Sequence, residues 1–286
     1  MIVLFNNSIN INIMNQVIIT TFYHFINLPN YESLKEPLLN FCKDNGLKGT
    51  ILVAREGVNS TISGTRDGID KLYIYLRDDF GITDLVYKES FHENQPFQKM
   101  KVNLKKEIVA LGVEDLDVEN LKGEYISPKD WDDFISREDV IVIDTRNKYE
   151  TLIGSFDNAI DPKTATFRQF PKWVKDNLDE VSKEQKIAMF CTGGVRCEKS
   201  TAFLKAKGFK NVYHLEGGIL KYFEDTEAKA WHGSCFVFDD RVALNKQLVS
   251  DQDLQCGKCE KHLDTDDLRR SALSEKMICI ECVCTQ

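Results

Sequence analysis

The sequence predicts a mixed α/β protein with two main domains and a small cysteine-rich tail. The chain has 286 residues, which at roughly 150 residues per domain corresponds to about two domains. Runs with the alternating apolar pattern of strands follow runs with the three-to-four-residue spacing of helices. Six of the nine cysteines lie beyond residue 232, where neither pattern persists.

The composition narrows the class of protein. Apolar residues make up 42% of the chain and charged residues 29%, as in globular proteins. The net charge of −8 excludes a surface that is basic overall, but not a local basic face. An odd number of cysteines favours free thiols over a disulfide framework.

The N-terminal sequence carries no targeting pattern. The first basic residue is Lys35, and no apolar stretch reaches the ~18 residues of a membrane span. We therefore expect a cytoplasmic protein with no membrane partner. Residues 1–16 are predicted to be a disordered extension, with Met14 as an alternative start.

The first domain is predicted over residues 17–113. Alternating or continuous apolar runs predict strands at 18–25, 49–54, 60–63, 85–90 and 101–104. Helical spacing of apolar residues predicts helices at 31–45 and 67–79. The first six elements follow the order βαββαβ, which indicates a ferredoxin-like domain.

A linker and a second domain are predicted next. Residues 114–124 carry five acids and one base, which predicts a solvated linker over 114–123. The second domain, 124–231, has apolar strands at 140–143, 187–190 and 212–215 and helices beginning at Ser127-Pro128 and spanning 170–181 and 200–208. This alternation predicts a parallel sheet, whose ligands bind at the carboxyl ends of its strands.

The most informative segment follows the second of these strands. The strand ends at Cys191, and the loop continues as Thr192, Gly193, Gly194, Val195, Arg196 and Cys197. Adjacent glycines allow several backbone N–H groups to converge at a helix N-terminus, where a thiol should have a lowered pKa. The pattern indicates a nucleophilic cysteine or a persulfide carrier, or else a buried structural cysteine. Cys197 is either a resolving thiol or a small packed residue.

This loop resembles the active-site loop of the rhodanese family. Asp144-Thr145-Arg146, at the end of an earlier strand, shares the resemblance. Four residues separate Cys191 from Arg196, whereas thiolate phosphatases have five, so the tighter cradle argues against a phosphatase. Asp144 and Arg146 are predicted to be supporting residues that buttress neighbouring loops.

Several longer segments are similar to the bacterial tRNA uridine(34) hydroxylases. They are residues 49–64, 105–109, 190–199 and 211–219, in the family's order within a match from 17 to about 242. The resemblance implies a ferredoxin-like domain joined to a rhodanese domain, and oxygen-dependent conversion of the wobble uridine of tRNA to 5-hydroxyuridine. It places the essential cysteine at Cys191 and makes molecular oxygen a co-substrate. No electron donor is indicated, because the chain has no dinucleotide fingerprint.

Two roles for Cys191 stay open at this point. The thiolate would either add to C6 of uracil or carry a persulfide or an oxidised sulfur. A sulfurtransferase is therefore the alternative function. A non-enzymatic RNA-binding protein is the third, and the retained Cys191 argues against it.

The predicted partner is the tRNA anticodon loop, so we expect local basic surfaces. Residues 95–106 contain no acid, and the region after the loop is also basic. The candidate RNA-binding residues are Lys99, Lys101, Lys105, Lys106, Lys199, Lys205 and Lys207.

The tail, residues 232–286, contains two Cys-x-x-Cys pairs. Cys256/Cys259 and Cys279/Cys282 are separated by 19 residues, a spacing typical of a zinc ribbon. A redox thiol pair and a loosely ordered tail are the alternatives. We expect little apolar core in this tail, so that a structural zinc would supply much of its folding energy.

Overall fold

The computed structural model describes residues 17–251, 253–274 and 277–283. The predicted extension 1–16 and Cys284 lie outside these ranges. The chain divides into two compact units, Met1–Ile108 and Val109–Gln286. Among the described residues, no helix combines the length and apolarity needed to span a membrane.

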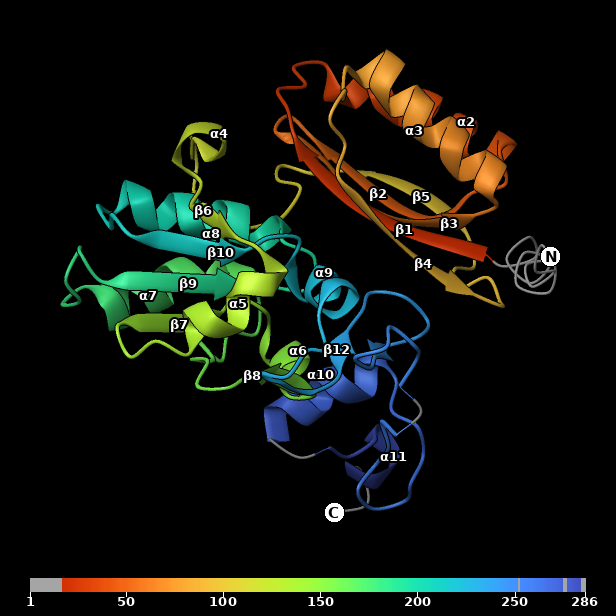
Figure 1. Cartoon of the computed structure of the whole chain (residues 1–286). Helices are drawn as coiled ribbons and strands as arrows, with labels where there is room; N and C mark the ends of the chain where they lie inside the picture. The colour runs from red at the N-terminus through yellow and green to blue at the C-terminus, as the bar shows by residue number, and fades with distance from the viewer. Residues whose placement is uncertain (1–16, 252, 275–276, 284–286) are drawn as a thin grey trace, which may run out of the picture. The chain divides into compact units, whose positions relative to one another are not determined.

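Unit 1 is a five-stranded sheet with helices on one face (Figure 1). Its elements are β1 (Val17–Phe25), η1 (Tyr31–Leu34), α2 (Lys35–Asp44), β2 (Lys48–Ala54), β3 (Gly57–Gly64), α3 (Arg66–Phe80), β4 (Tyr87–His92) and β5 (Met100–Leu104). The strand order is β4-β1-β3-β2-β5, and only β5 pairs in parallel, with β2. The predicted ferredoxin-like arrangement is confirmed, with β5 as an added edge strand.

The core of unit 1 follows from strand alternation. Ile18 and Phe22 of β1 point to the helix side, where they pack with Leu72 and Leu76 of α3. Ile19 and Thr21, which alternate with them on β1, point to the opposite face of the sheet, whereas Thr20 shares their side and bonds to Tyr73 of α3 over 2.6 Å. On that second face Ile19 is buried and Thr21 is half-exposed.

Unit 2 contains a four-stranded parallel sheet in the order β6-β10-β9-β7. Its sheet and helices comprise α4 (Val118–Leu121), β6 (Glu124–Ile126), α5 (Pro128–Ile135), β7 (Val140–Asp144), α6 (Lys148–Thr151), β8 (Gly154–Phe156), η2 (Phe167–Gln169), α7 (Phe170–Leu178), β9 (Lys186–Phe190), α8 (Val195–Ala206), β10 (Val212–Leu215) and α9 (Gly218–Asp225). The C-terminal elements are β11 (Trp231–Gly233), β12 (Cys235–Phe236), β13 (Ala243–Leu244), α10 (Thr265–Ser274) and α11 (Ile280–Val283). The parallel sheet and the cap of α5 by Ser127, with Pro128 in its first turn, are confirmed.

Two predicted boundaries are wrong. Val109 and Val113 pack against the core of unit 2, so the first domain ends at residue 108 rather than 113. The predicted solvated linker contains α4, whose Val118 is buried. The segment was predicted to be solvated because of its acids, but these occupy exposed positions while apolar residues between them point inward.

The helix predicted from residue 200 begins five residues earlier, as α8. Gly194 stands at its N-cap with φ 101°, a left-handed conformation that glycine adopts without strain. The loop after Cys191 therefore turns directly into the helix.

The cysteine-rich tail is not separate from the parallel-sheet domain. β11 pairs with β8, which places the start of the tail against the preceding fold. A further core contains Phe236, Leu254 and Leu268 of the tail together with Tyr149 and Ile153. The expectation of little apolar core is wrong, since α6 and β8 contribute the surface on which the tail packs.

Candidate active site and metal centre

Cys191 lies at the carboxyl end of β9, one of the two middle strands of the parallel sheet. The four residues from Thr192 to Val195 lead from this strand into α8. The Gly194 N–H donates to the Cys191 sulfur over 3.1 Å. The thiol is buried, with none of its residue surface exposed.

The surroundings of Cys191 favour its thiolate. Burial by itself would raise the pKa, but the Cys197 thiol, the backbone N–H groups of Cys197 and Gly194, and the Arg196 charge lower it to about 5. Burial and the neighbouring Cys191 raise the pKa of Cys197. Cys197 therefore remains protonated and donates to the thiolate.

Arg196 is held by a carboxylate that the sequence analysis did not identify. Its two terminal nitrogens donate to the two oxygens of Glu150 over 2.6 and 2.7 Å. Burial opposes ionisation of Glu150, but Arg196 lowers its pKa below the usual range. Thr192 also donates to Glu150 over 3.3 Å. The ion pair thus fixes both the guanidinium and the loop that follows Cys191.

The sequence around Glu150 contains a recognisable pattern, but that pattern predicts a different role for this residue. Asn147 and Glu150 form a capping box at the start of α6, a pattern visible in the sequence. That pattern predicts a helix start. It does not predict a contact with a residue 46 positions away.

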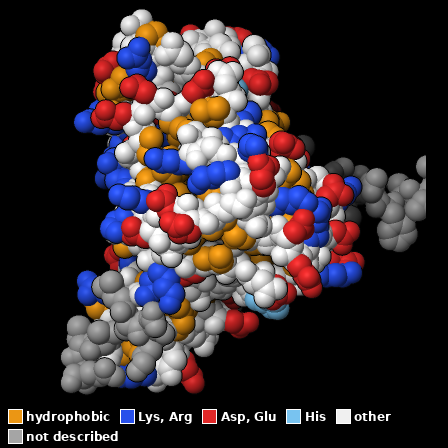
Figure 2. Space-filling model, turned by 90° about the vertical axis from the view of Figure 1, so that its left-hand side faces the viewer, with side chains coloured by type: hydrophobic (Ala, Val, Ile, Leu, Met, Phe, Trp, Pro, Cys, Tyr) orange, Lys and Arg blue, Asp and Glu red, His pale blue; other side chains and the backbone are white. Residues whose placement is uncertain are grey.

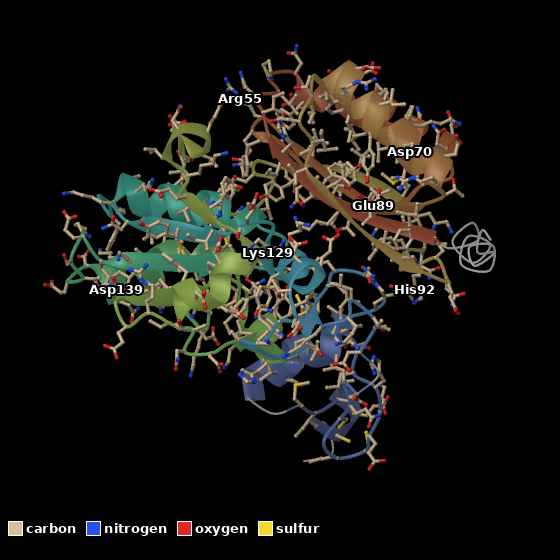
Figure 3. All side chains as sticks on the ribbon, in the orientation of Figure 1. Arg55, Asp70, Glu89, His92, Lys129 and Asp139 are labelled. Carbon is tan, nitrogen blue, oxygen red and sulfur yellow. The ribbon has the colours of Figure 1, made fainter. Side chains whose placement is uncertain are left out.

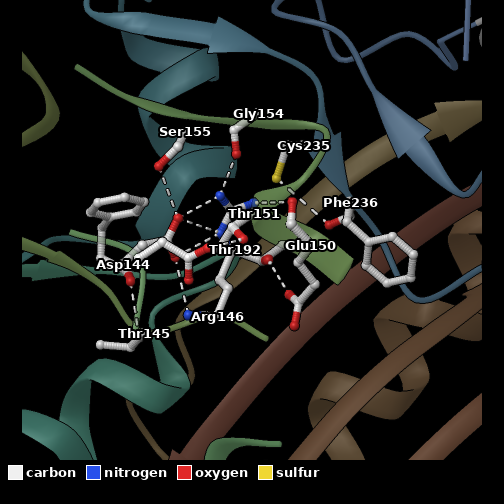
Figure 4. Close-up of polar contacts among 12 residues, drawn as sticks. Asp144, Thr145, Arg146, Glu150, Thr151, Gly154, Ser155, Thr192, Cys235 and Phe236 are labelled. Carbon is white, nitrogen blue, oxygen red and sulfur yellow. Dashed lines mark hydrogen bonds and ion pairs between the residues drawn. The ribbon is translucent and has the colours of Figure 1, made fainter. Parts of the chain in front are cut away.

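Asp144 and Arg146 form a second buried ion pair, at 2.6 Å (Figure 4). Arg146 also donates to the carbonyl of Gly154 over 2.6 Å and to that of Glu150 over 3.3 Å. Ser155 donates to Asp144 over 3.0 Å. These contacts connect the end of β7 to α6 and β8.

Thr145 and Gly218 also position the loop. The Thr145 hydroxyl donates to the Phe190 carbonyl over 2.9 Å and lies 3.7 Å from the Cys197 sulfur. At Gly218, φ is 69° and an added Cβ would lie 2.5 Å from the Cys191 carbonyl oxygen. The N–H of Ile219 donates to this same carbonyl over 3.0 Å. Only glycine permits this approach of α9 to the loop.

The candidate RNA-binding lysines do not all lie on the surface. Lys99, Lys101, Lys105 and Lys106 are exposed, and Lys205 and Lys207 are half-exposed or exposed. Lys199 is only 1% exposed, and its amine donates to the carbonyl of Val109 over 3.1 Å. Its assignment to the RNA-binding surface is therefore wrong: it holds the start of unit 2 to α8. Basic side chains are interspersed with acidic and apolar ones on the face in Figure 2.

The four tail cysteines gather at one point. The sulfur atoms of Cys256, Cys259, Cys279 and Cys282 all lie within 4.8 Å of one another. Tetrahedral zinc with Zn–S bonds of ~2.3 Å separates its sulfurs by about 3.8 Å, so the cluster fits such an ion. The backbone N–H of Cys279 donates to the Cys256 sulfur over 3.3 Å, which favours a thiolate ligand.

The fold and the loop define a cysteine-centred protein with a rhodanese-like domain. Two family models match the chain: a UPF0176 acylphosphatase like domain over residues 17–108 and a Rhodanese-like domain over residues 127–225. A tRNA uridine(34) hydroxylase of Wolbachia pipientis wMel is 51% identical over 267 residues, covering 93% of this chain and 96% of the relative. The chain belongs to the tRNA uridine(34) hydroxylase family.

A second relative has the same name, and a solved structure of a rhodanese-like domain protein aligns with part of this chain. The tRNA uridine(34) hydroxylase of a Culex pipiens strain of Wolbachia pipientis is also 51% identical, covering 93% of this chain and 94% of its own. Among solved structures, a Rhodanese-like domain protein from Staphylococcus aureus aligns at 26% identity and a TM-score of 0.29. It covers 35% of this chain and 90% of that one.

Proposed function

We propose that this chain hydroxylates uridine 34 of tRNA to 5-hydroxyuridine and that Cys191 reacts with the base. The observation that carries the proposal is a buried thiolate at the N-terminus of α8, with a pKa of about 5. It occurs in a chain whose curated relatives are named for this activity. The tRNA pool lies in the cytoplasm, where we expect the protein to act.

The thiolate supports covalent activation of the uracil ring. Addition of the Cys191 sulfur to C6 forms a C–S bond and leaves the electron pair at C5 as an enolate. C5 then attacks an electrophilic oxygen derived from molecular oxygen. Loss of the C5 proton and expulsion of the thiolate restore the aromatic ring. One oxygen atom enters the base and the other becomes water, which consumes two electrons from a separate donor.

Nucleoside analysis of tRNA tests the proposal. Cells that lack the protein should lose 5-hydroxyuridine derivatives, and the native chain should restore them. Cys191→Ala should not restore them, whereas Cys42→Ala, which alters a core cysteine of unit 1, should. Full restoration by Cys191→Ala would refute the role of the thiol.

A sulfurtransferase is the second candidate, favoured by the resemblance of the Cys191 loop to that of rhodaneses. In that case Cys191 would carry a persulfide, and the deletion would remove thiolated nucleosides instead. The intact mass of the protein distinguishes the two, because a persulfide adds the mass of one sulfur atom.

Two sites accompany the catalytic proposal. Lys99, Lys101, Lys105, Lys106, Lys205 and Lys207 contribute positive charge for the tRNA backbone. The four cysteines of the tail bind one structural zinc ion, for which the fit of the sulfur cluster is the support.

A further inference from the structure

The face of the unit 1 sheet that points away from α2 and α3 has an unusual composition. Two rows of side chains cross its centre, as the strand register requires. The first row is Lys88, Thr21, Thr61, Thr50 and Lys101, and the second is Tyr23, Asn59, Leu52 and Asn103. All nine residues are half-exposed or exposed. We call these two rows the open sheet face.

The open sheet face contains no acid, although the chain has 45 acids against 37 bases. Glu89 of β4 is the only acid in the five described strands of unit 1. It points to the helix side (Figure 3), where Arg66 and Tyr73 donate to it over 2.8 and 2.9 Å. The negative charge of the sheet is therefore confined to the face that the helices cover.

Two lysines and one aromatic ring give this face the chemistry of a nucleic-acid surface. Lys88 and Lys101 lie on the outer strands, four strand spacings or about 19 Å apart. The Lys88 amine lies over the Tyr23 ring, 5.9 Å from its centre, so a positive charge and an aromatic ring lie together on this face. Aromatic rings stack on unpaired bases, and lysines bind backbone phosphates. A protein partner would instead favour an apolar centre, whereas Leu52 and the Tyr23 ring are the apolar groups among these nine residues.

We infer that the open sheet face binds the backbone of the tRNA substrate, with Tyr23 stacking on an unpaired base. The inference rests on the proposed function for the identity of the RNA. It adds Lys88, Tyr23 and the threonine row to the lysines recognised from sequence, and it explains how an acidic chain attracts tRNA. Thr21 and Thr61 share a hydrogen bond of 3.3 Å, and the Asn59 amide donates to the Ile108 carbonyl over 3.0 Å. The Thr50 hydroxyl and the Asn103 amide would therefore be the donors to phosphate and ribose oxygens.

Equilibrium binding of an unmodified tRNA transcript to the full-length chain, followed by fluorescence anisotropy, tests the inference without turnover. Lys88→Glu and Lys101→Glu should each raise the Kd about tenfold, and the double Lys→Gln variant should reduce the slope of log Kd against log salt by roughly 1.4. The matched control is Lys43→Glu, the same charge change at the end of α2 on the helix side, with an expected change below twofold.

Tyr23→Ala should weaken binding about tenfold, whereas Tyr23→Phe should retain the stacking.

The outcomes separate this inference from the proposed function. Equal losses from Lys43→Glu and Lys101→Glu would overturn it, since binding would then follow net charge alone. Native affinity in Lys88→Gln and Tyr23→Ala, with far-ultraviolet circular dichroism confirming the fold, would overturn it even if the chain hydroxylates tRNA. A chain that binds tRNA through this face but leaves uridine 34 unmodified would refute the proposed function alone.

Discussion

The reactivity of Cys191 depends on hydrogen-bond donors and a positive charge, which lower the pKa of the thiol although its burial raises that pKa. Between pH 6 and pH 8, alkylation of a thiol with an ordinary pKa accelerates roughly a hundredfold, because the thiolate fraction rises. With a pKa of about 5, Cys191 is already a thiolate across this range. We expect its alkylation by iodoacetamide to be nearly constant above pH 6 and to fall only below about pH 5. Peptide mass spectrometry can follow Cys191 separately from the other cysteines.

Cys197 provides the matched test of that explanation. Cys197→Ala removes the thiol donor to Cys191, so the alkylation profile should move to higher pH. Cys197→Ser keeps a hydroxyl donor and should move it less. An unchanged profile in Cys197→Ala would show that the backbone N–H groups and Arg196 suffice.

Glu150 should matter for stability because it neutralises a buried charge. Glu150→Gln leaves Arg196 without its carboxylate, and breaking a buried ion pair costs about 3–5 kcal/mol. The exposed pair of Asp139 with Lys186 provides the control, since Asp139→Asn should cost under about 1 kcal/mol. Trp131, Trp173 and Trp231 all lie in unit 2, so urea unfolding followed by tryptophan fluorescence reports on this unit. Equal costs would contradict the proposed role.

At the scale of elements, the approach of α9 to the Cys191 loop depends on one glycine. Gly218→Ala places a methyl group 2.5 Å from the Cys191 carbonyl oxygen, so the loop must move. We expect activity to fall about a hundredfold, since displacements of ~1 Å have such effects. Gly208→Ala has the same positive-φ strain, at φ 89°, but no atom within 4 Å. It should retain activity, and similar losses in the two variants would mean that strain alone is responsible.

Local patterns predicted the elements well but not the contacts between them. Ser127-Pro128 marks the start of α5, and the alternation in β1 marks its two faces, because both signals lie within a few neighbouring residues. The Cys191 loop was recognisable for the same reason. Glu150 and Gly218 contact the loop from 46 and 27 residues away along the chain, so no local pattern predicts these contacts. For Lys199 the local pattern was misleading: its place in a charged run predicted an exposed side chain, but the side chain is buried.

At the scale of the molecule, the tail connects the cysteine cluster to the Cys191 loop through α6. Tyr149 shares a core with Leu268 and Ala272 of α10, and Arg269 lies 5.6 Å from the centre of the Tyr149 ring. Tyr149 directly precedes Glu150, whose carboxylate holds Arg196. A change in the tail that displaces α10 would therefore reach the ion pair that fixes the Cys191 loop.

Loss of the proposed zinc should consequently alter Cys191 as well as the tail. Elemental analysis should find one zinc per chain, and Cys259→Ser combined with Cys282→Ser should abolish it and lower the urea midpoint reported by tryptophan fluorescence. Because α10 then packs less firmly on α6, the Cys191 alkylation profile should shift to higher pH. Cys42→Ser, which leaves the cluster intact, should retain the zinc and the profile. A folded native chain without zinc would contradict the metal site. A zinc-free variant with an unchanged profile would contradict the coupling alone, since α6 would then hold Glu150 without support from the tail.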